Sequence, residues 1–212
     1  MKDDIKIILF GAPGSGKGTQ AVVLAQRLGV KRISLGDILR DEVKKQTPLG
    51  SEVKGYMEKG LLVPDELVSR VIEESIIRQG FILDGYPRTL NQAKALDKIL
   101  DKQGIDIDAF VVLEVDQETV INRLSKRRVC KACGAVYHLT NMPSKVEGVC
   151  DSCGGELIQR KDDNMEVIKK RWEVFNKENT PLLDFYQKKG KVISLDGRKD
   201  KDEVFEQLAK EL

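Results

Sequence analysis

The chain has 212 residues, of which 41% are hydrophobic and only 5% aromatic, so aliphatic side chains must form most of its core. Its 36 Lys and Arg residues nearly balance 34 Asp and Glu residues, leaving a net charge of +2. This balance argues against a general nucleic-acid-binding protein, which would carry a clear basic excess. We expect a cytoplasmic chain that does not bind membranes, because it has no signal-peptide pattern and no apolar run of roughly 18 residues.

Apolar runs alternate with helical patterns along the chain. Strands are predicted over residues 5–10, 31–35, 80–85, 109–115 and 191–195. Helices are predicted over residues 19–28, 38–45, 65–79, 89–100, 117–128 and 200–212. Asp37 is the expected N-cap of the second helix, and Pro48 and Gly50 are expected to break the chain after it. This alternation indicates an α/β fold with a parallel sheet.

A glycine-rich segment, GAPGSGKGT at 11–19, joins the first strand to the first helix. Its successive backbone N–H groups can cradle phosphate oxygens, and the helix adds its positive end. Lys17 can reach the β- and γ-phosphates of a nucleotide. Gly18 stands where the common phosphate-loop pattern has Ser or Thr. We interpret the segment as a phosphate-binding loop, in preference to a tight turn with a surface lysine.

Four cysteines form two C-x-x-C pairs separated by residues 134–149. The set is Cys130, Cys133, Cys150 and Cys153. This spacing is typical of a structural zinc site, with iron in the same cage as the alternative. Disulfides are disfavoured in a reducing cytoplasm, and a redox site would need only one pair. Residues 129–159 carry few apolar side chains, so we expect an inserted subdomain that a metal stabilises, with His138 playing a structural part.

Several separated motifs resemble the adenylate kinase family of nucleoside monophosphate kinases, over roughly residues 5–212. They are GAPGSGKGT, ISLGDILR at 33–40, GLLVPDELV at 60–68, LDGYPRTLNQA at 83–93 and RKDD at 160–163. The resemblance implies a P-loop NTPase-like α/β fold with a five-stranded parallel sheet flanked by helices, a helical monophosphate-binding insertion and a four-cysteine zinc lid. The implied divisions are core 1–33, monophosphate-binding region 34–63, core 64–128, lid 129–163 and core 164–212.

The same resemblance implies a reaction and its partners. The chain would transfer the γ-phosphoryl group of ATP·Mg²⁺ reversibly to AMP, giving two ADP, as a monomer with a structural Zn²⁺. Asp84 would hold the waters around Mg²⁺. Lys17, Arg88, Arg127, Arg160 and Arg171 would be catalytic, because the transition state spreads negative charge over several oxygens.

The resemblance also assigns the two nucleotide sites. The donor ATP would contact Gly14, Ser15, Gly16, Lys17, Gly18, Thr19, Arg123, Arg127, Val136, Tyr137 and Lys199. The acceptor AMP would contact Leu35, Arg40, Met57, Leu61, Val63, Gly85, Arg88, Gln92, Arg160 and Arg171. Arg123 and Arg127, four residues apart, are expected to share one helix face. Gln92 would read the adenine edge, because an amide offers a paired donor and acceptor.

Three alternatives stay open at this point. Leu35 stands where the family usually has threonine, so UMP or CMP is a second candidate acceptor. GTP is a second candidate donor, because the lid contacts are partly made by the backbone. A zinc-ribbon nucleic-acid-binding module is the remote third, which the near-zero net charge and the absence of interleaved aromatic residues disfavour.

Overall fold

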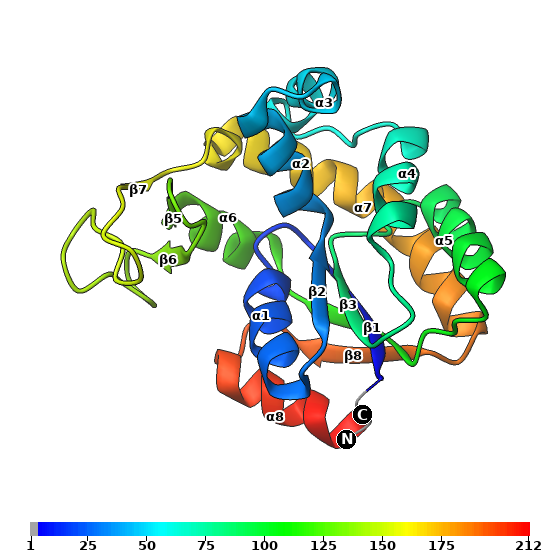
Figure 1. The fold of residues 1–212 in the computed structure, drawn as a ribbon. Coiled ribbons are helices and arrows are strands. Elements are labelled where there is room, and N and C mark those ends of the chain that lie inside the picture. Colours follow the sequence, from blue (N-terminus) through cyan, green and yellow to red (C-terminus); the bar gives the residue numbers. More distant parts are fainter. Residues whose placement is uncertain (1–3) are drawn as a thin grey trace.

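A computed structural model describes residues 4–212 as a sheet between layers of helices, with a small subdomain projecting to one side (Figure 1). The first three residues of the predicted core segment 1–33 lie outside the described part. Among residues 4–212, no helix is both long enough and apolar enough to cross a membrane.

The central sheet has five parallel strands in the order β2-β3-β1-β4-β8. Its strands are β1 (Lys6–Gly11), β2 (Lys31–Ser34), β3 (Phe81–Asp84), β4 (Ala109–Glu114) and β8 (Val192–Asp196). All the predicted strands are therefore confirmed. Because the strands are parallel, their carboxyl ends meet at one edge, where α/β proteins bind ligands.

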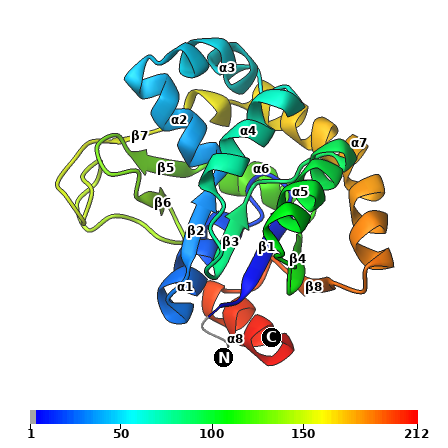
Figure 2. The ribbon, with the colours of Figure 1, turned by 45° about the vertical axis from the view of Figure 1, so that its right-hand side comes forward.

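Helices cover both faces of this sheet (Figure 2). The helices are α1 (Lys17–Leu28) and α8 (Lys201–Glu211) on one face, and α4 (Asp65–Ser75), α5 (Leu90–Gln103) and α7 (Met165–Lys188) on the other. Along β1, Ile7 and Leu9 pack with α1 and α8, whereas Ile8 and Phe10 pack with α4, α5 and α7. A strand buried on both faces needs apolar residues at every position, which explains the continuous apolar run.

The helix α2 (Leu35–Lys45) begins earlier than the sequence predicts. Its N-cap is Ser34, whose hydroxyl accepts a hydrogen bond from the Asp37 backbone N–H at 3.4 Å. The expected cap Asp37 is wrong, because Asp37 already lies in the first turn. Its carboxylate instead pairs with Arg32 and Arg40.

A further helix, α3 (Pro48–Glu58), lies where a break was expected. Pro48 occupies its first turn, where a missing N–H costs nothing. Thr47 caps it by accepting from the Gly50 N–H at 3.0 Å. Gly50 is needed because a Cβ there would lie 2.1 Å from the Glu42 carbonyl oxygen of α2. The Pro and Gly therefore start a helix and pack it closely against α2, and the predicted break is wrong.

The other predicted helices are confirmed, but two of them end early. The helix α4 ends at Ser75, because Ile76 adopts an extended conformation with φ −68° and ψ 136°. The helix α6 (Gln117–Ser125) ends before Arg127, which begins strand β5. Arg123 and Arg127 thus do not share a helix face, and that expectation is wrong.

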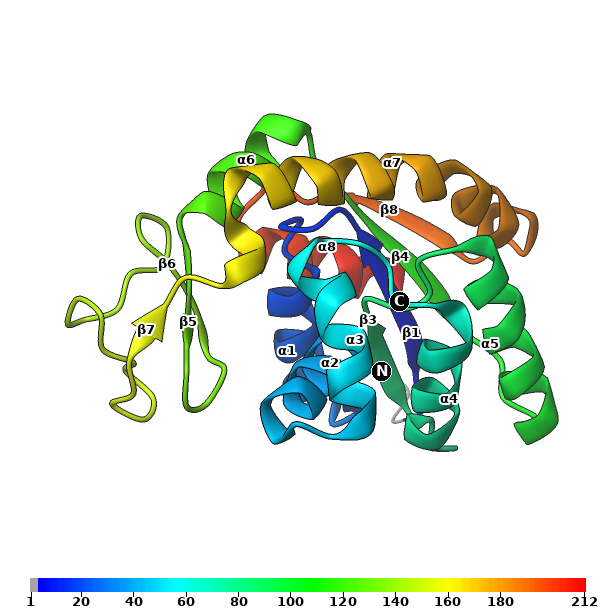
Figure 3. The same cartoon turned by 90° about the horizontal axis from the view of Figure 1, so that it is seen from above.

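The inserted subdomain predicted around the cysteines is present. It contains a three-stranded antiparallel sheet, ordered β6-β5-β7. Its strands are β5 (Arg127–Cys130), β6 (Val136–His138) and β7 (Leu157–Ile158), and the short helix η1 (Lys161–Asp163) leads back to α7. Figure 3 shows this subdomain beside the core, reached from α6 and returning into α7. We call residues 129–163 of this subdomain the lid, with the bounds given above.

Candidate active site

The glycine-rich loop between β1 and α1 forms a cradle of backbone N–H groups. Gly14 and Gly16 have φ of 80° and 98°, left-handed values that favour glycine. No side chain caps α1, which begins at Lys17. Its first-turn N–H groups thus remain available for an anion. Ser15 is buried, and its hydroxyl has no hydrogen-bond partner among the described residues.

Lys17 lies at the start of α1 and has an unusually low pKa. Its ammonium donates to the Ala12 carbonyl oxygen at 3.0 Å. Desolvation by burial, together with repulsion from the nearby cations Arg88, Arg171 and Arg127, lowers the pKa of Lys17 to about 7 against the opposing effect of Asp84. A bound phosphate would counter this repulsion and favour the charged ammonium.

Two arginines from different elements share one buried carboxylate. Arg127 of β5 donates to both oxygens of Asp163, with Nε and Nη2 distances of 2.8 and 2.6 Å. Arg171 of α7 contacts Asp163 Oδ1 at 3.4 Å and Asp162 Oδ2 at 2.9 Å. The Asp163 side chain is fully buried. This carboxylate therefore joins the lid base to the long helix α7 and fixes both guanidinium groups.

Arg160 and Arg88 bring further positive charge to the same space. Arg160 makes no side-chain hydrogen bond or ion pair within residues 4–212, and burial with repulsion from Arg40 and Arg127 lowers its pKa to about 9. Arg88 donates from Nε to the Gly85 carbonyl at 2.9 Å. Burial and repulsion from Arg171 lower the pKa of Arg88 to about 10. These cations lower one another's pKa because they converge on one region. A bound polyanion would stabilise their charged forms.

Asp84 ends strand β3 beside the glycine-rich loop and is 6% exposed. Its Oδ2 would lie 3.5 Å from a Cβ built on Gly18, so this carboxylate faces the start of α1. Arg32, the second residue of β2, contacts the same oxygen at 2.6 Å. An oxygen ligand next to a phosphate cradle has the chemistry that Mg²⁺ prefers.

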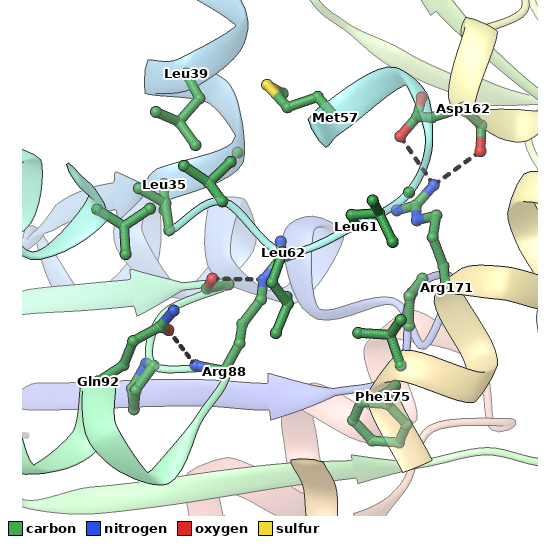
Figure 4. Close-up of a pocket in the computed structure, with 18 of the residues that line it drawn as sticks. Leu35, Leu39, Met57, Leu61, Leu62, Arg88, Gln92, Asp162, Arg171 and Phe175 are labelled. Atoms are coloured by element: carbon green, nitrogen blue, oxygen red, sulfur yellow. Dashed lines mark hydrogen bonds and ion pairs between the residues drawn. The ribbon is translucent and has the colours of Figure 1, made fainter. Parts of the chain in front are cut away.

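A pocket opens between α2, α3, β3 and α7 (Figure 4). Arg88 and Gln92 lie at one end of it, and Arg171 and Asp162 lie at the other. Of the residues assigned to the acceptor, Leu35, Arg40, Met57, Leu61, Val63, Gly85, Arg88, Gln92 and Arg171 line this pocket together with Lys17. Arg160 does not line it. The apolar side chains suit a flat base, and the cations suit its phosphate.

The sequence model of the adenylate kinase family matches residues 9–191, which is most of the chain. The chain belongs to the adenylate kinase family. An adenylate kinase of Caldanaerobacter subterraneus subsp. tengcongensis is 48% identical over 212 residues, covering 98% of this chain and 96% of that relative. Those of Carboxydothermus hydrogenoformans and Clostridium tetani are 49% and 46% identical, over 95% and 97% of this chain and 96% and 97% of the relatives. Family membership confirms the resemblance on which the sequence interpretation rests.

The lid of this family member carries the four cysteines close together. Their sulfur atoms all lie within 4.8 Å of one another, with Cys130–Cys153 and Cys133–Cys150 separations of 3.5 and 3.6 Å. A tetrahedral Zn²⁺ with bonds of about 2.3 Å separates its sulfurs by about 3.8 Å, so the set fits zinc. All four cysteines are free thiols. His138 is not part of the cluster; its Nδ1 accepts from backbone N–H groups of the following turn.

The two C-x-x-C pairs fold as matching turns. Each pair is followed by a glycine whose N–H donates to the carbonyl of the first cysteine, at 3.0 Å for Gly134 and 2.8 Å for Gly154. Both glycines have positive φ, 77° and 71°. This shared geometry presents the sulfur atoms of both pairs to one centre.

The residues that the adenylate kinase resemblance assigns to the donor lie partly in the core and partly in the lid. In the core, Gly14 to Thr19 form the phosphate cradle. Arg123 donates to the carbonyl oxygens of Gly197 at 2.8 Å and Ser15 at 3.2 Å, which ties the cradle to the loop after β8, where Lys199 is exposed.

The lid residues of the donor set point in different directions. Val136 is 40% exposed. The Tyr137 side chain packs inside the lid, where its hydroxyl lies 3.4 Å from Cys150 Sγ and accepts from the Asp151 N–H at 2.8 Å. A contact from Tyr137 to a nucleotide would therefore come from its main chain.

The sequence interpretation missed several acidic partners of the cations. Asp163 and Asp162 hold Arg127 and Arg171, and Asp37 pairs with Arg32 and Arg40. The adjacent acids of RKDD gave a signal, because carboxylates next to predicted phosphate-binding arginines are natural ion-pair partners. Asp65, which contacts Gln92, carried no such signal, because the two residues are 27 positions apart.

Proposed function

We propose that this chain transfers the γ-phosphoryl group of ATP to the α-phosphate of AMP, reversibly, giving two ADP. The observation that carries the proposal is the convergence of Lys17 with arginines from several separate elements on a phosphate cradle and a pocket with apolar walls. The acceptor phosphate is already an anion, so the reaction needs no general base. The only histidine, His138, lies in the lid.

The proposed step forms a bond between an AMP phosphate oxygen and Pγ while the bond from Pγ to the β-phosphate bridging oxygen breaks. No proton has to move, so positioning and charge stabilisation supply the catalysis. The cradle N–H groups and Lys17 hold the donor phosphates, and Arg40 and Arg88 hold the acceptor phosphate. We propose that Arg127, Arg160 and Arg171 stabilise the charge that spreads over the transferring group.

Asp84 is proposed to hold the hydration shell of the Mg²⁺ that accompanies ATP. When bound, this ion neutralises charge on the donor phosphates. Asp84 suits the task because it is nearly buried, lies at the carboxyl edge of the sheet and faces Gly18.

We propose that the cysteine cluster holds one structural Zn²⁺. Four thiolates close its coordination sphere, so it would brace the lid without taking part in the chemistry. Lid closure is established for adenylate kinases as a class, where it keeps water from the transferring group. Here residues 129–163 are proposed to move as the lid, and residues 34–63 to bind the monophosphate. That the chain works as a monomer in the cytoplasm, and binds neither nucleic acid nor membranes, stays a prediction.

Leu35 keeps the choice of acceptor open. It lines the pocket with a buried apolar side chain and offers no hydroxyl to the base. Gln92 then supplies the polar contact to the base edge, which favours AMP. UMP and CMP stay as second candidates for the acceptor, and GTP for the donor.

Purified protein should form ADP from ATP and AMP with Mg²⁺, which chromatography of the nucleotides measures directly. Lys17→Met should abolish this turnover while the circular dichroism spectrum stays unchanged. A panel of AMP, GMP, CMP and UMP, each with ATP and with GTP, identifies both substrates. Absence of turnover with every pair would defeat the proposed function.

A further inference from the structure

We propose that Asp65 fixes the orientation of the Gln92 amide, so that the site selects acceptor bases with an amino group on their pairing edge over bases with a keto group there. The inference rests on the proposed function, in which Gln92 faces the acceptor base. It assigns a part in specificity to Asp65, a residue that does not line the pocket.

The Gln92 amide is held from two sides. Its Oε1 accepts from the Arg88 backbone N–H at 2.7 Å, and its Nε2 donates to Asp65 Oδ1 at 2.7 Å. Gln92 is 2% exposed, so water does not replace these partners. Asp65 is held in turn, because its other oxygen accepts from the Thr89 hydroxyl at 3.2 Å.

These two partners permit only one amide orientation. A backbone N–H can only donate, and an ionised carboxylate can only accept. If the Gln92 amide turned over, its NH₂ group would face the Arg88 N–H and its oxygen would face the Asp65 carboxylate. Both contacts would be repulsive and both buried groups would lose their hydrogen bonds.

A fixed amide leaves a fixed pattern for the base. One Nε2–H and one Oε1 lone pair of Gln92 remain, a donor beside an acceptor. Adenine and cytosine match it, because each carries an amino group beside a ring nitrogen that accepts. Guanine and uracil carry a keto oxygen beside a ring N–H, which is the reverse pattern. A freely rotating glutamine would match both classes, so the discrimination depends on what holds the amide.

The test is Asp65→Asn, which keeps the size of the side chain. An asparagine amide can itself turn to satisfy either orientation of Gln92, so one of the two penalties for the reversed amide disappears. We expect the ratio of kcat/KM for AMP to that for GMP, and for CMP to that for UMP, to fall about tenfold. Each ratio compares bases of equal ring size, so a general loss of activity cancels.

Two controls separate this effect from a structural one. Glu66→Gln removes the neighbouring first-turn carboxylate of α4, which is exposed and does not contact Gln92, and should leave both ratios unchanged. In a Gln92→Leu background, Asp65→Asn should have no further effect on the ratios. Where turnover of GMP or UMP is too slow to measure, calorimetric Kd values for the monophosphates give the same ratios.

Unchanged ratios in Asp65→Asn, with AMP still turned over, would overturn the inference and leave the proposed function intact. A wild-type protein that phosphorylates no monophosphate would instead defeat the proposed function itself. Equal loss of discrimination in Asp65→Asn with and without Gln92 would also count against the inference, because Asp65 would then act through another group.

Discussion

The guanidinium of Arg32 bridges Asp84 and Asp37, with Nη2 at 2.6 Å from Asp84 Oδ2 and Nη1 at 2.8 Å from Asp37 Oδ2. Asp84 is the carboxylate proposed to hold the waters around Mg²⁺. A fixed cation on this oxygen lowers the local negative charge and competes with the metal's hydration shell for the same lone pairs. We therefore expect Arg32 to lower the affinity of this proposed site for a divalent cation.

Arg32→Gln should tighten divalent-metal binding to the ATP-loaded protein several-fold, because Asp84 loses its competing cation. Titration with Mn²⁺, followed by electron paramagnetic resonance, measures this without relying on turnover. The variant should also lose about 1–3 kcal/mol of unfolding free energy, since the charged hydrogen bond to Asp84 is removed. Arg32→Lys keeps the charge and serves as the control. Equal Mn²⁺ affinity in the wild type and Arg32→Gln would contradict the prediction.

Binding of ATP at pH 8 should be accompanied by uptake of a proton at Lys17. Burial lowers the pKa of Lys17 from 10.5 to about 7, so the free protein carries this amine largely neutral at pH 8. Phosphates favour its charged form and raise the pKa again. Calorimetry of ATP binding, without AMP, in two buffers of different ionisation enthalpy measures the uptake.

The uptake should fall as the pH drops below 7, where the free protein already carries the proton. Lys17→Met should remove it at pH 8, because Arg88 and Arg160 have pKa values of about 10 and 9 and stay charged there. In the free protein, Lys17 also makes stability rise with pH between about 7 and 10.5, since the unfolded chain binds more protons in that window. Proton uptake that persists in Lys17→Met would assign it to another group.

Local patterns in the sequence predicted the parts of this fold that depend on local causes. The strand at Ile7–Phe10 is continuous in apolar residues because two helical layers bury it. For the glycine-rich loop and the paired C-x-x-C motifs, the spacing of the residues along the chain was enough to predict their local arrangement. The pocket residues followed from the family resemblance, and most of them do lie together around one space.

The predictions that proved wrong concern residues whose structure depends on partners distant in the sequence. Helical periodicity continues past Ser125, but pairing with His138 of β6 makes Arg127 part of a strand. Pro48 and Gly50 look like a break, yet the close approach of α2 makes them the start of a helix. The adjacent acids of RKDD make Asp163 a candidate ion-pair partner, but only the fold places it against Arg127, 36 positions earlier.

The lid should contain about one zinc per chain, because its sulfur positions fit a tetrahedral ion. Elemental analysis of the purified protein distinguishes zinc from iron in the same cage. Cys133→Ser with Cys153→Ser changes the two exposed ligands and should lower the Tm and make the lid sensitive to protease. Ser152→Ala, in the same loop, is the matched control. Full stability after complete removal of metal would rule out the bracing role.

Asp163→Asn should weaken both the fold and the reaction, because it removes the negative charge that Arg127 and Arg171 share. Asp163 is fully buried, and both arginine side chains are less than one-fifth exposed, at 17% and 16%. Removing one partner of such a cluster leaves buried charge uncompensated, which costs about 3 kcal/mol or more of unfolding free energy. Denaturation by urea measures this loss, and kcat should fall because both guanidinium groups lose their fixed positions.

Asp162→Asn is the matched comparison for Asp163→Asn. Asp162 contacts Arg171 alone among the arginines and is 22% exposed, so its loss should cost less than that of Asp163. Nucleotides should raise the Tm of Asp163→Asn more than that of the wild type, because their phosphates replace the missing anion beside Arg127. Equal destabilisation by the two variants, with no added effect of nucleotide, would show that Asp163 does not organise the arginine cluster.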